Sequence, residues 1–276
     1  MIDKNKVKKN FSSAEEYDNH TSYHNITMAM ISESVKEFNK NGKFLQILDV
    51  GCGTAQGYDA LKTNLNQGGF KYFGLDIAIG LLDKAKERIN KTGRGSNDAY
   101  LINGDAELLP FKPDKFDVIF SNITIHWLND IDIFLLRCKT SLKNDGIMIF
   151  AFLISGTLQE LKESFKYDEN CCGLKFHEFP EIGSYKKKIE AFGLKIEYCD
   201  IIEYTETAES SLSLLKRINL LGAKNTFDNN NHKTGLLRKG LKNYDKNYRN
   251  EDDMVYCTYK IAYLIISKKN KPPIIL

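Results

Sequence analysis

Short apolar runs alternate with amphipathic segments along most of this 276-residue chain. Runs such as FLQILDV (44–50) and IMIFAFLI (147–154) are rich in Ile, Leu and Phe, which is typical of strands that are buried on both faces. Between the runs, apolar positions recur every three or four residues, which predicts helices. We expect strands at 44–50, 72–77, 99–102, 117–122, 147–154, 194–204 and 255–267, and helices near 55–65, 79–92, 129–142 and 183–193. Because strands and helices alternate in this order, the pattern predicts an α/β fold with a doubly wound, mainly parallel, seven-stranded sheet.

The same pattern divides the chain into four parts. Residues 1–43 are expected to form an N-terminal helical lid, since Ser13-Ala14-Glu15-Glu16 has the form of a capping box and apolar residues follow it at helical spacing. Ligands of open parallel sheets lie beyond the carboxyl ends of the strands, so an insertion before the last strand is placed to cap the substrate. A helical hairpin without a functional role is the alternative. The remaining parts are a core at 44–204, a helical insertion at 205–250 with helices about 208–222 and 233–249, and a last strand and tail at 251–276.

Composition narrows the class of protein. Apolar residues make up 42% and charged residues 27%, as in an ordinary globular domain. The first residues carry lysines but no apolar run follows them, and no run is long enough to cross a bilayer, so we expect a cytoplasmic protein without a membrane or nucleic-acid partner. Six cysteines without paired spacing indicate neither a metal site nor a disulfide framework.

Charge is distributed unevenly along the chain. Residues 205–276 hold 13 Lys and Arg against 7 Asp and Glu, whereas the preceding residues hold 26 against 29. This basic C-terminal part suits an acidic partner or substrate, although a solvated charged surface gives the same pattern.

The segment LDVGCGTAQG (48–57) is a glycine-rich turn between an expected strand and an expected helix. Gly51 and Gly53 lack side chains, so the backbone can approach a bound nucleotide closely. Asp76 ends the next strand, where a carboxylate can accept hydrogen bonds from ribose hydroxyls. Asp105 follows the third strand and could bind the exocyclic amine of an adenine, with Ala106 against the ring.

A dinucleotide-binding dehydrogenase also combines a glycine turn with an acid. Its pattern places a third glycine three residues after the second, but that position here is Gln56, and the glycine falls at Gly57. Asp49 precedes the turn, where it would repel a pyrophosphate and attract a cation. The residues therefore favour a positively charged nucleoside.

These segments resemble the successive motifs of class I S-adenosylmethionine methyltransferases, whose fold is Rossmann-like. The likeness covers 44–153 and rests on Asp49-Val50-Gly51-Cys52-Gly53, Asp76, Asp105-Ala106 and the strand FDVIFSN. It implies that Asp49 and the glycines hold the methionine portion and that Asp76 holds the ribose. The expected cofactor-binding residues are Asp49, Gly51, Cys52, Gly53, Asp76, Ile77, Asp105, Ala106 and Asn122, with Tyr17 and His24 from the lid.

A narrower resemblance extends over nearly the whole chain. FSSAEEYD (11–18), SNITIHW (121–127), SGTLQEL (155–161), HEFP (177–180), LLGAKN (220–225) and TYKIAYLI (258–265) are similar to segments of the biotin-pathway malonyl-acyl-carrier-protein O-methyltransferases. The sequence departs from that family at His126 and His24, where glutamine is usual. The resemblance implies methylation of the free carboxylate of malonyl-acyl-carrier protein or malonyl-CoA, with S-adenosylhomocysteine as the second product. A carboxylate with a pKa of about 4 is ionised at neutral pH, so this reaction needs no general base.

The acceptor needs hydrogen-bond donors or cations. Trp127 and the basic residues Lys216, Arg217, Lys224 and Arg238 are candidates for this role, and the basic C-terminal part is a candidate docking surface for an acidic carrier protein. His126 follows the fourth strand and is the candidate for orienting the acceptor, or for acting as a base toward another acceptor. A packed, hydrogen-bonded histidine is the equally weighted alternative.

Two other functions fit parts of the sequence. The His126-Trp127 pair and YRNED (248–252) are similar to mitochondrial complex I assembly factors, which implies a protein that acts on an arginine side chain of a protein partner. A methyltransferase for a small carboxylic acid or a quinone precursor is the other alternative.

Overall fold

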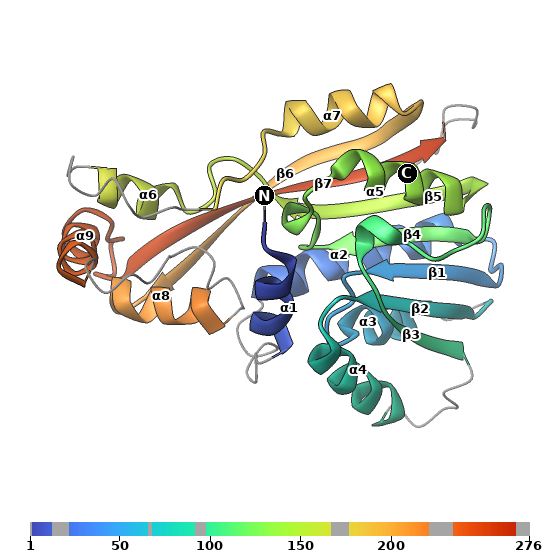
Figure 1. The fold of residues 1–276 in the computed structure, drawn as a ribbon, viewed down its shortest axis with the longest axis horizontal. Helices are drawn as coiled ribbons and strands as arrows, with labels where there is room; N and C mark the ends of the chain where they lie inside the picture. The colour runs from blue at the N-terminus through green and yellow to red at the C-terminus, as the bar shows by residue number, and fades with distance from the viewer. Residues whose placement is uncertain are drawn as a thin grey trace.

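A seven-stranded sheet forms the centre of the protein (Figure 1). The computed structural model describes residues 2–12, 22–65, 68–91, 98–166, 177–220 and 234–268. The strands are β1 (Leu45–Val50), β2 (Phe70–Asp76), β3 (Ala99–Asn103), β4 (Phe116–Asn122), β5 (Leu142–Leu153), β6 (Leu194–Ala208) and β7 (Val255–Lys268). Their order is β3-β2-β1-β4-β5-β7-β6, with β7 antiparallel to both neighbours and the other pairs parallel. The predicted fold class is therefore confirmed.

Helices cover both faces of this sheet. The sheet divides the apolar interior into two clusters, one on each face. The cluster on one face receives side chains from α2 (Ser22–Phe38), α3 (Gln56–Asn64) and α4 (Ile79–Lys91). The cluster on the other face receives them from α5 (Ile131–Ser141) and α7 (Ile182–Ala191). Two covered faces explain why most positions of β1 and β4 are buried.

Strands β6 and β7 form a long antiparallel ribbon that projects beyond the rest of the sheet (Figure 1). The helices α6 (Gln159–Lys166), α8 (Ser211–Leu220) and α9 (Thr234–Asn247) lie around its projecting end. Leu214, Ile218 and Tyr244 are buried there, and the Tyr244 hydroxyl donates to the Tyr256 carbonyl at 2.6 Å. We call this end of the molecule, α6, α8, α9 and the ribbon between them, the cap.

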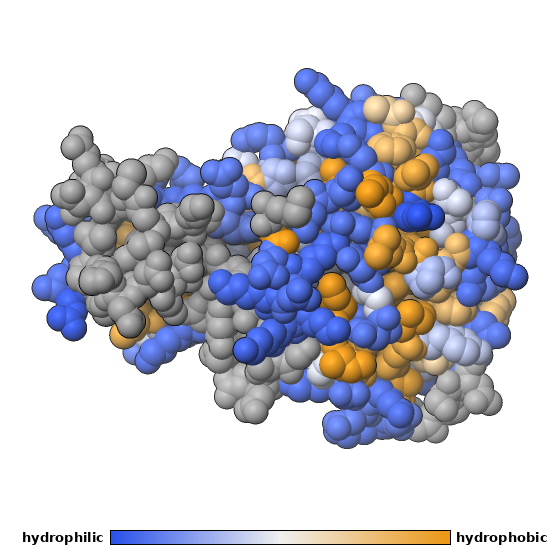
Figure 2. All heavy atoms as spheres, viewed as in Figure 1, coloured by the Kyte–Doolittle hydropathy of each residue, from blue (hydrophilic) through white to orange (hydrophobic). Residues whose placement is uncertain are grey.

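The two ends of the molecule differ in surface character. In the face shown in Figure 2, apolar side chains lie mainly over the sheet, whereas the described part of the cap is mostly hydrophilic. Leu108, Ile133 and Leu136 are among the exposed apolar residues. None of the helices in the described part of the chain is long and apolar enough to cross a membrane.

Three differences from the expected elements have physical causes. β6 continues to Ala208, past the expected boundary at 204, because β7 supplies backbone partners along its whole length. β5 begins at Leu142, where the chain leaves α5 and pairs with Phe116. Helix α6 was not expected, and in the N-terminal part the helices are α1 (Lys4–Ser12) and α2, while the capping box lies outside the described residues.

Candidate cofactor and acceptor site

The glycine turn after β1 requires glycine at its first position. Gly51 has φ +77°, and a Cβ atom built there would lie 2.2 Å from the Thr124 side chain. The Gly51 N–H donates to the Leu75 carbonyl at 2.7 Å, which joins the turn to the end of β2. No other residue type fits this backbone without moving Thr124. The sequence explained Gly51 by a close approach of the backbone to a ligand. The structure adds a second reason, which is the contact of Gly51 with Thr124 in the loop after β4.

Asp76 closes the turn from the second strand. Its Oδ2 accepts a hydrogen bond from the Gly53 N–H at 2.9 Å, and its Oδ1 accepts one from the Ala78 N–H at 2.8 Å. Burial raises the pKa of Asp76, and the bonds from the backbone of Ala78, Gly53 and Ile77 oppose this by stabilising the carboxylate. Asp76 is 8% exposed, and it lines the pocket beside the turn.

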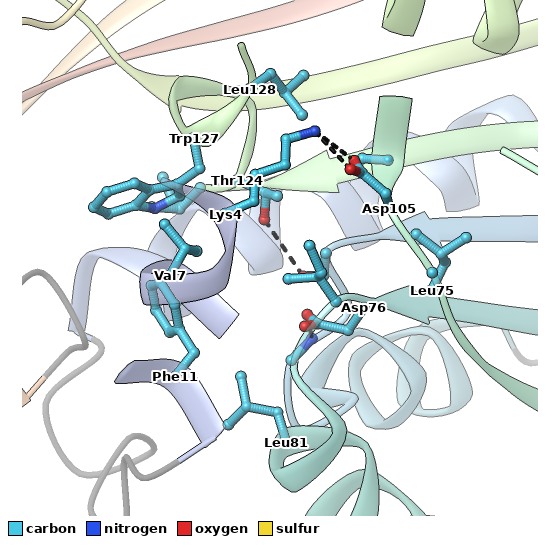
Figure 3. A pocket seen from close by; sticks show the side chains of 16 residues that line it. Lys4, Val7, Phe11, Leu75, Asp76, Leu81, Asp105, Thr124, Trp127 and Leu128 are labelled. Atoms are coloured by element: carbon cyan, nitrogen blue, oxygen red, sulfur yellow. Dashed lines mark hydrogen bonds and ion pairs between the residues drawn. The ribbon is translucent and has the colours of Figure 1, made fainter. Parts of the chain in front are cut away.

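A pocket opens beside this turn at the carboxyl edge of the sheet (Figure 3). Its empty volume is about 660 Å³ with the open solvent at its mouth included. Seven residues selected from the sequence line it: Gly51, Gly53, Asp76, Ile77, Asp105, Ala106 and Trp127. Sequence reasoning did not select the others, which include Lys4, Val7 and Phe11 of α1, and Ile123 and Thr124 after β4.

Asp49 lies behind the turn and does not line the pocket. It is 3% exposed, its Oδ2 accepts a hydrogen bond from the Tyr72 hydroxyl at 2.6 Å, and the same oxygen packs against Gly57. Burial raises the pKa of Asp49 to about 7, and the negative charge of Asp76 adds to this, whereas the Tyr72 hydrogen bond acts against it. Cys52 is also buried, with its thiol toward the Gly53 carbonyl at 3.9 Å. A cation placed near a buried acid such as Asp49 lowers the pKa of that acid and favours its ionised form.

Lys4 reaches across the pocket from α1. Its Nζ lies 2.6 Å from Asp105 Oδ2 and 2.8 Å from Glu107 Oε2, and the side chains of all three residues are less than a quarter exposed. Figure 3 shows the contact between Lys4 and Asp105 on the side of the pocket away from Val7 and Phe11. Nothing in the sequence pattern signals the contact, because Lys4 is one of several lysines near the N-terminus. The residue expected to bind an adenine amine therefore already has a cationic partner.

Asn122 and His24 lie next to the pocket and support its wall. Asn122 Nδ2 donates to the His24 carbonyl at 3.0 Å, and Asn122 Oδ1 accepts from the Thr27 hydroxyl at 2.7 Å. The His24 ring stacks on Tyr23 with centroids 4.4 Å apart, and burial lowers the pKa of His24 to about 3. These contacts join α2 to the end of β4. Tyr17 lies outside the described residues.

Aromatic side chains form a second wall beside Trp127. The His177 ring lies 5.1 Å from the Trp127 ring and 4.8 Å from the Phe179 ring, and the His126 ring lies 5.7 Å from that of Phe179. We call His126, Trp127, His177 and Phe179 the aromatic wall. Burial, followed by the charges of His177 and His24, lowers the pKa of His126, so its ring is neutral at pH 7. His126 is 5% exposed, and among the described residues its Nδ1 has no hydrogen-bond partner.

The basic residues selected from the insertion do not meet at the aromatic wall. Arg217 donates to the Thr207 carbonyl at 2.9 Å and pairs with Glu206 at 3.5 Å. Arg238 and Lys216 are exposed on α9 and α8, and Lys224 lies outside the described residues. Lys162 of α6, which sequence reasoning did not select, has its Nζ 5.4 Å from the centre of the Phe179 ring. Within the described chain, no group of three or more His, Cys, Asp or Glu side chains has the arrangement of a metal site.

The pocket fits a cationic nucleoside. A bare backbone turn, the acid Asp76 at its side, and apolar contacts from Ile77 and Leu81 supply what a ribose and an adenine require, and the acid Asp49 behind the turn favours a positive charge nearby. Among the described residues that line the pocket, Lys4 is the one whose charge would oppose a cation, and Asp105 and Glu107 neutralise it.

Comparisons with known proteins agree with this chemistry. Residues 48–150 match the family model described as a methyltransferase domain. A malonyl-[acyl-carrier protein] O-methyltransferase of Gallionella capsiferriformans is 29% identical over 226 residues, which cover 79% of this chain and 75% of that protein. The human mitochondrial arginine-hydroxylase NDUFAF5 is 29% identical over 251 residues, which cover 85% of this chain and 66% of that protein.

Solved structures share the fold. The phosphoethanolamine N-methyltransferase 2 of Haemonchus contortus, in complex with phosphomonomethylethanolamine and S-adenosylhomocysteine, has a TM-score of 0.55 and is 18% identical, with 95% of this chain and 60% of that chain covered. The predicted cofactor and enzyme class are confirmed. The chain is an S-adenosylmethionine-dependent methyltransferase of class I, and it resembles the malonyl-[acyl-carrier protein] O-methyltransferases.

Proposed function

We propose that this enzyme methylates the free carboxylate of a malonyl thioester, carried by an acyl-carrier protein or by coenzyme A. The observation that carries the proposal is the buried His126 ring beside the cofactor pocket, whose Nδ1 has no hydrogen-bond partner in the described chain. A buried, unpaired polar atom is costly, and an acceptor oxygen at this place would pair with it. The names of relatives such as the Gallionella protein support the choice of a malonyl carboxylate.

The cofactor residues have distinct roles in this proposal. Asp76 accepts hydrogen bonds from the ribose hydroxyls, Asp105 and Ala106 meet the adenine, and Gly51 and Gly53 meet the methionine portion, with the acid Asp49 behind the turn. S-adenosylmethionine supplies the electrophilic methyl group when it is bound. For Asp105 to bond an adenine amine, it must share its oxygens with Lys4, which now lies 2.6 Å away.

The protein's own contribution is orientation and exclusion of water. A carboxylate is already ionised at neutral pH, so no residue has to remove a proton. The Phe11 ring of α1 contacts the Trp127 ring edge-on at 5.8 Å, which closes the space between lid and aromatic wall. Holding the acceptor oxygen in line with the methyl group then provides the main acceleration.

An anionic acceptor also needs a positive charge near it. Lys162 carries such a charge beside the aromatic wall. Its ammonium group lies against Phe179, and its charge lowers the pKa of the adjacent His177. In this proposal Lys162 attracts the anionic acceptor, with the hydrogen-bonding groups of the aromatic wall completing its binding.

The decisive experiment supplies purified protein with labelled S-adenosylmethionine and malonyl-acyl-carrier protein, followed by a test for an alkali-labile methyl ester. We expect labelled ester, and a His126→Phe variant that binds S-adenosylhomocysteine normally but forms less ester. Tight cofactor binding with no transfer to the malonyl thioester would contradict the proposal. Transfer only to free small acids would indicate the small-molecule alternative.

Carrier docking is tested separately, because the cap carries the basic charge. Arg238 and Lys239 lie exposed on α9. We expect the double variant R238E/K239E to raise the KM for malonyl-acyl-carrier protein while the KM for malonyl-CoA stays within about twofold, since surface charges mainly affect association. Equal behaviour of the variant and the wild type toward the carrier protein would contradict docking at α9.

A second candidate function follows from the human relative. That relative is named an arginine-hydroxylase, and the likeness covers 85% of this chain. On this reading the aromatic wall would receive an arginine side chain of a protein partner, since guanidinium groups stack on aromatic rings. Modification of an arginine-containing protein without ester formation would favour this candidate.

A further inference from the structure

His177 makes a long-range contact that no motif predicts. Its Nε2 lies 3.1 Å from the backbone oxygen of His126, 51 residues earlier in the chain. A carbonyl oxygen only accepts hydrogen bonds, so Nε2 must carry the proton and donate it. The contact therefore fixes the tautomer of His177 as well as the separation of the two segments.

Both segments are held from other directions. Ser155, just after β5, donates its N–H to the Pro180 carbonyl at 3.0 Å, which anchors the 177–180 segment to the sheet. On the other side, the Trp127 N–H donates to the Thr124 carbonyl at 2.9 Å within the short 3-10 helix Ile125–Trp127. The His177 hydrogen bond joins these two fixed points, together with the ring contacts of the aromatic wall.

The short helix Ile125–Trp127 presents groups to both substrates. Trp127 lines the cofactor pocket (Figure 3), and the next residue back is His126, with its buried and unpaired Nδ1. A displacement of the His126 backbone would therefore move the His126 ring and Trp127 together. Misplacement by about 1 Å at a reacting group is enough to slow a reaction by about 100-fold.

We propose that His177 is a positioning residue: by donating Nε2–H to the His126 carbonyl, it sets where the His126 ring and Trp127 meet the methyl acceptor. The acceptor part of this inference rests on the proposed function. Burial lowers the pKa of His177, the His126 carbonyl and Glu178 act in the opposite direction, and Lys162 adds to the lowering. His177 is thus a neutral donor at pH 7, and its Nδ1 carries a lone pair.

Two amide substitutions test the donor. The amide nitrogen of H177Q reaches the position of Nε2 and can donate to the same carbonyl, whereas that of H177N is too short. We expect H177N to lower kcat for ester formation by about 100-fold, with the Kd for S-adenosylhomocysteine within about threefold. H177Q should restore kcat to within about fivefold of the wild type. Glu178→Gln, an exposed neighbour, serves as the matched control and should leave kcat unchanged.

A second measurement requires no methyl acceptor. Trp127 is the single tryptophan of the chain, so acrylamide quenching of its fluorescence reports on the short helix alone. We expect stronger quenching in H177N than in the wild type, and wild-type quenching in H177Q. If H177N and H177Q behave alike in quenching, the positioning role is wrong. If the wild type binds cofactor but forms no ester, the proposed function fails, and quenching alone decides the role of His177. A kcat for H177N equal to that of the wild type would also overturn the inference.

Discussion

The cofactor side and the acceptor side of this enzyme are built in different ways. The cofactor pocket consists of the glycine turn after β1 and carboxylates at the ends of β2 and β3, which accept hydrogen bonds from nearby backbone, Asp76 from Gly53 and Ala78 and Asp105 from Glu107. The aromatic wall consists of neutral rings from segments about 50 residues apart, joined by the bond between His177 and His126. The first side is built from short local motifs, and the second, where we propose that the acceptor binds, is built by tertiary packing.

This difference teaches where specificity can change. A carboxylate at a strand end has its position set by the sheet, so any chain with this topology can reuse it. The aromatic wall depends on which segments follow β5, and a small shift there alters the acceptor site without touching the pocket. A relative named a malonyl-[acyl-carrier protein] O-methyltransferase and one named an arginine-hydroxylase both align with this chain.

The largest expected effect is a loss of cofactor binding when Asp76, a residue of the cofactor side, is replaced. We expect Asp76→Ala to weaken S-adenosylhomocysteine binding by about 1,000-fold, because two hydrogen bonds from ribose hydroxyls to a carboxylate are each worth about 2 kcal/mol. Titration calorimetry measures the change. Asp83→Ala, an exposed acid on α4, is the control and should bind normally. If Asp76→Ala bound S-adenosylhomocysteine with a Kd within threefold of the wild type, Asp76 would not contribute to cofactor binding.

The second effect concerns the boundary where the two sides touch. Gly51→Ala places a methyl group against Thr124 on a backbone with φ +77°, so we expect it to lower the free energy of unfolding by about 3 kcal/mol. Gly183→Ala in α7 is the matched control, because nothing lies within 4 Å of its Cβ position, and it should raise stability by about 0.5–1 kcal/mol. Thermal and urea unfolding compare them. Equal stabilities would show that Thr124 moves freely, and the boundary would then not be rigid.

The third effect is the pH dependence that Asp49 adds on the cofactor side. Burial raises the pKa of Asp49 from 3.8 to about 7, so between these values the folded protein binds more protons than the unfolded one. The contribution of Asp49 to the free energy of unfolding therefore falls as pH rises from about 4 to about 7. Urea unfolding of the wild type and of Asp49→Asn across this range should reveal the fall as a difference between them.

The same acid predicts proton release on binding. A cationic cofactor favours the ionised form of Asp49, so binding of S-adenosylmethionine at pH 6.5 should release a fraction of one proton. Calorimetry in buffers of different ionisation enthalpy measures the release. Asp49→Asn should abolish it, and an unchanged release in that variant would assign the proton to another group.

The smallest effect tests whether α1 belongs to the cofactor side. Lys4→Met removes the ion pairs to Asp105 and Glu107 but keeps the apolar stem, so we expect S-adenosylhomocysteine to dissociate about three- to tenfold faster. Stopped-flow fluorescence of Trp127 follows the release. Lys8→Met, at an exposed position on the same helix, should leave the rate unchanged. A Lys4→Met rate equal to that of the wild type would mean that the ion pairs do not hold the lid.

Particular residues show how far the sequence could be used. Asp76 and Asp105 were identifiable because each ends or follows an apolar strand, and parallel strands bring such ends to one edge. Lys4 and Lys162 were not, because lysines at exposed helical positions are common and nothing local marks these two. Arg217 was selected for its charge, but the fold places Glu206 beside it.

The sequence by itself determined the order along the chain of the strands and of most helices, the glycine turn, and the class of cofactor. It did so because these features depend on neighbours along the chain: hydrophobic period, turn chemistry and the residue at a strand end. Only the tertiary structure decided that Asp49 bonds Tyr72 away from the pocket, that Lys4 holds Asp105, and that His177 fixes His126. These contacts join residues 23 to 101 positions apart, and their partners are set by how helices and loops pack on the sheet.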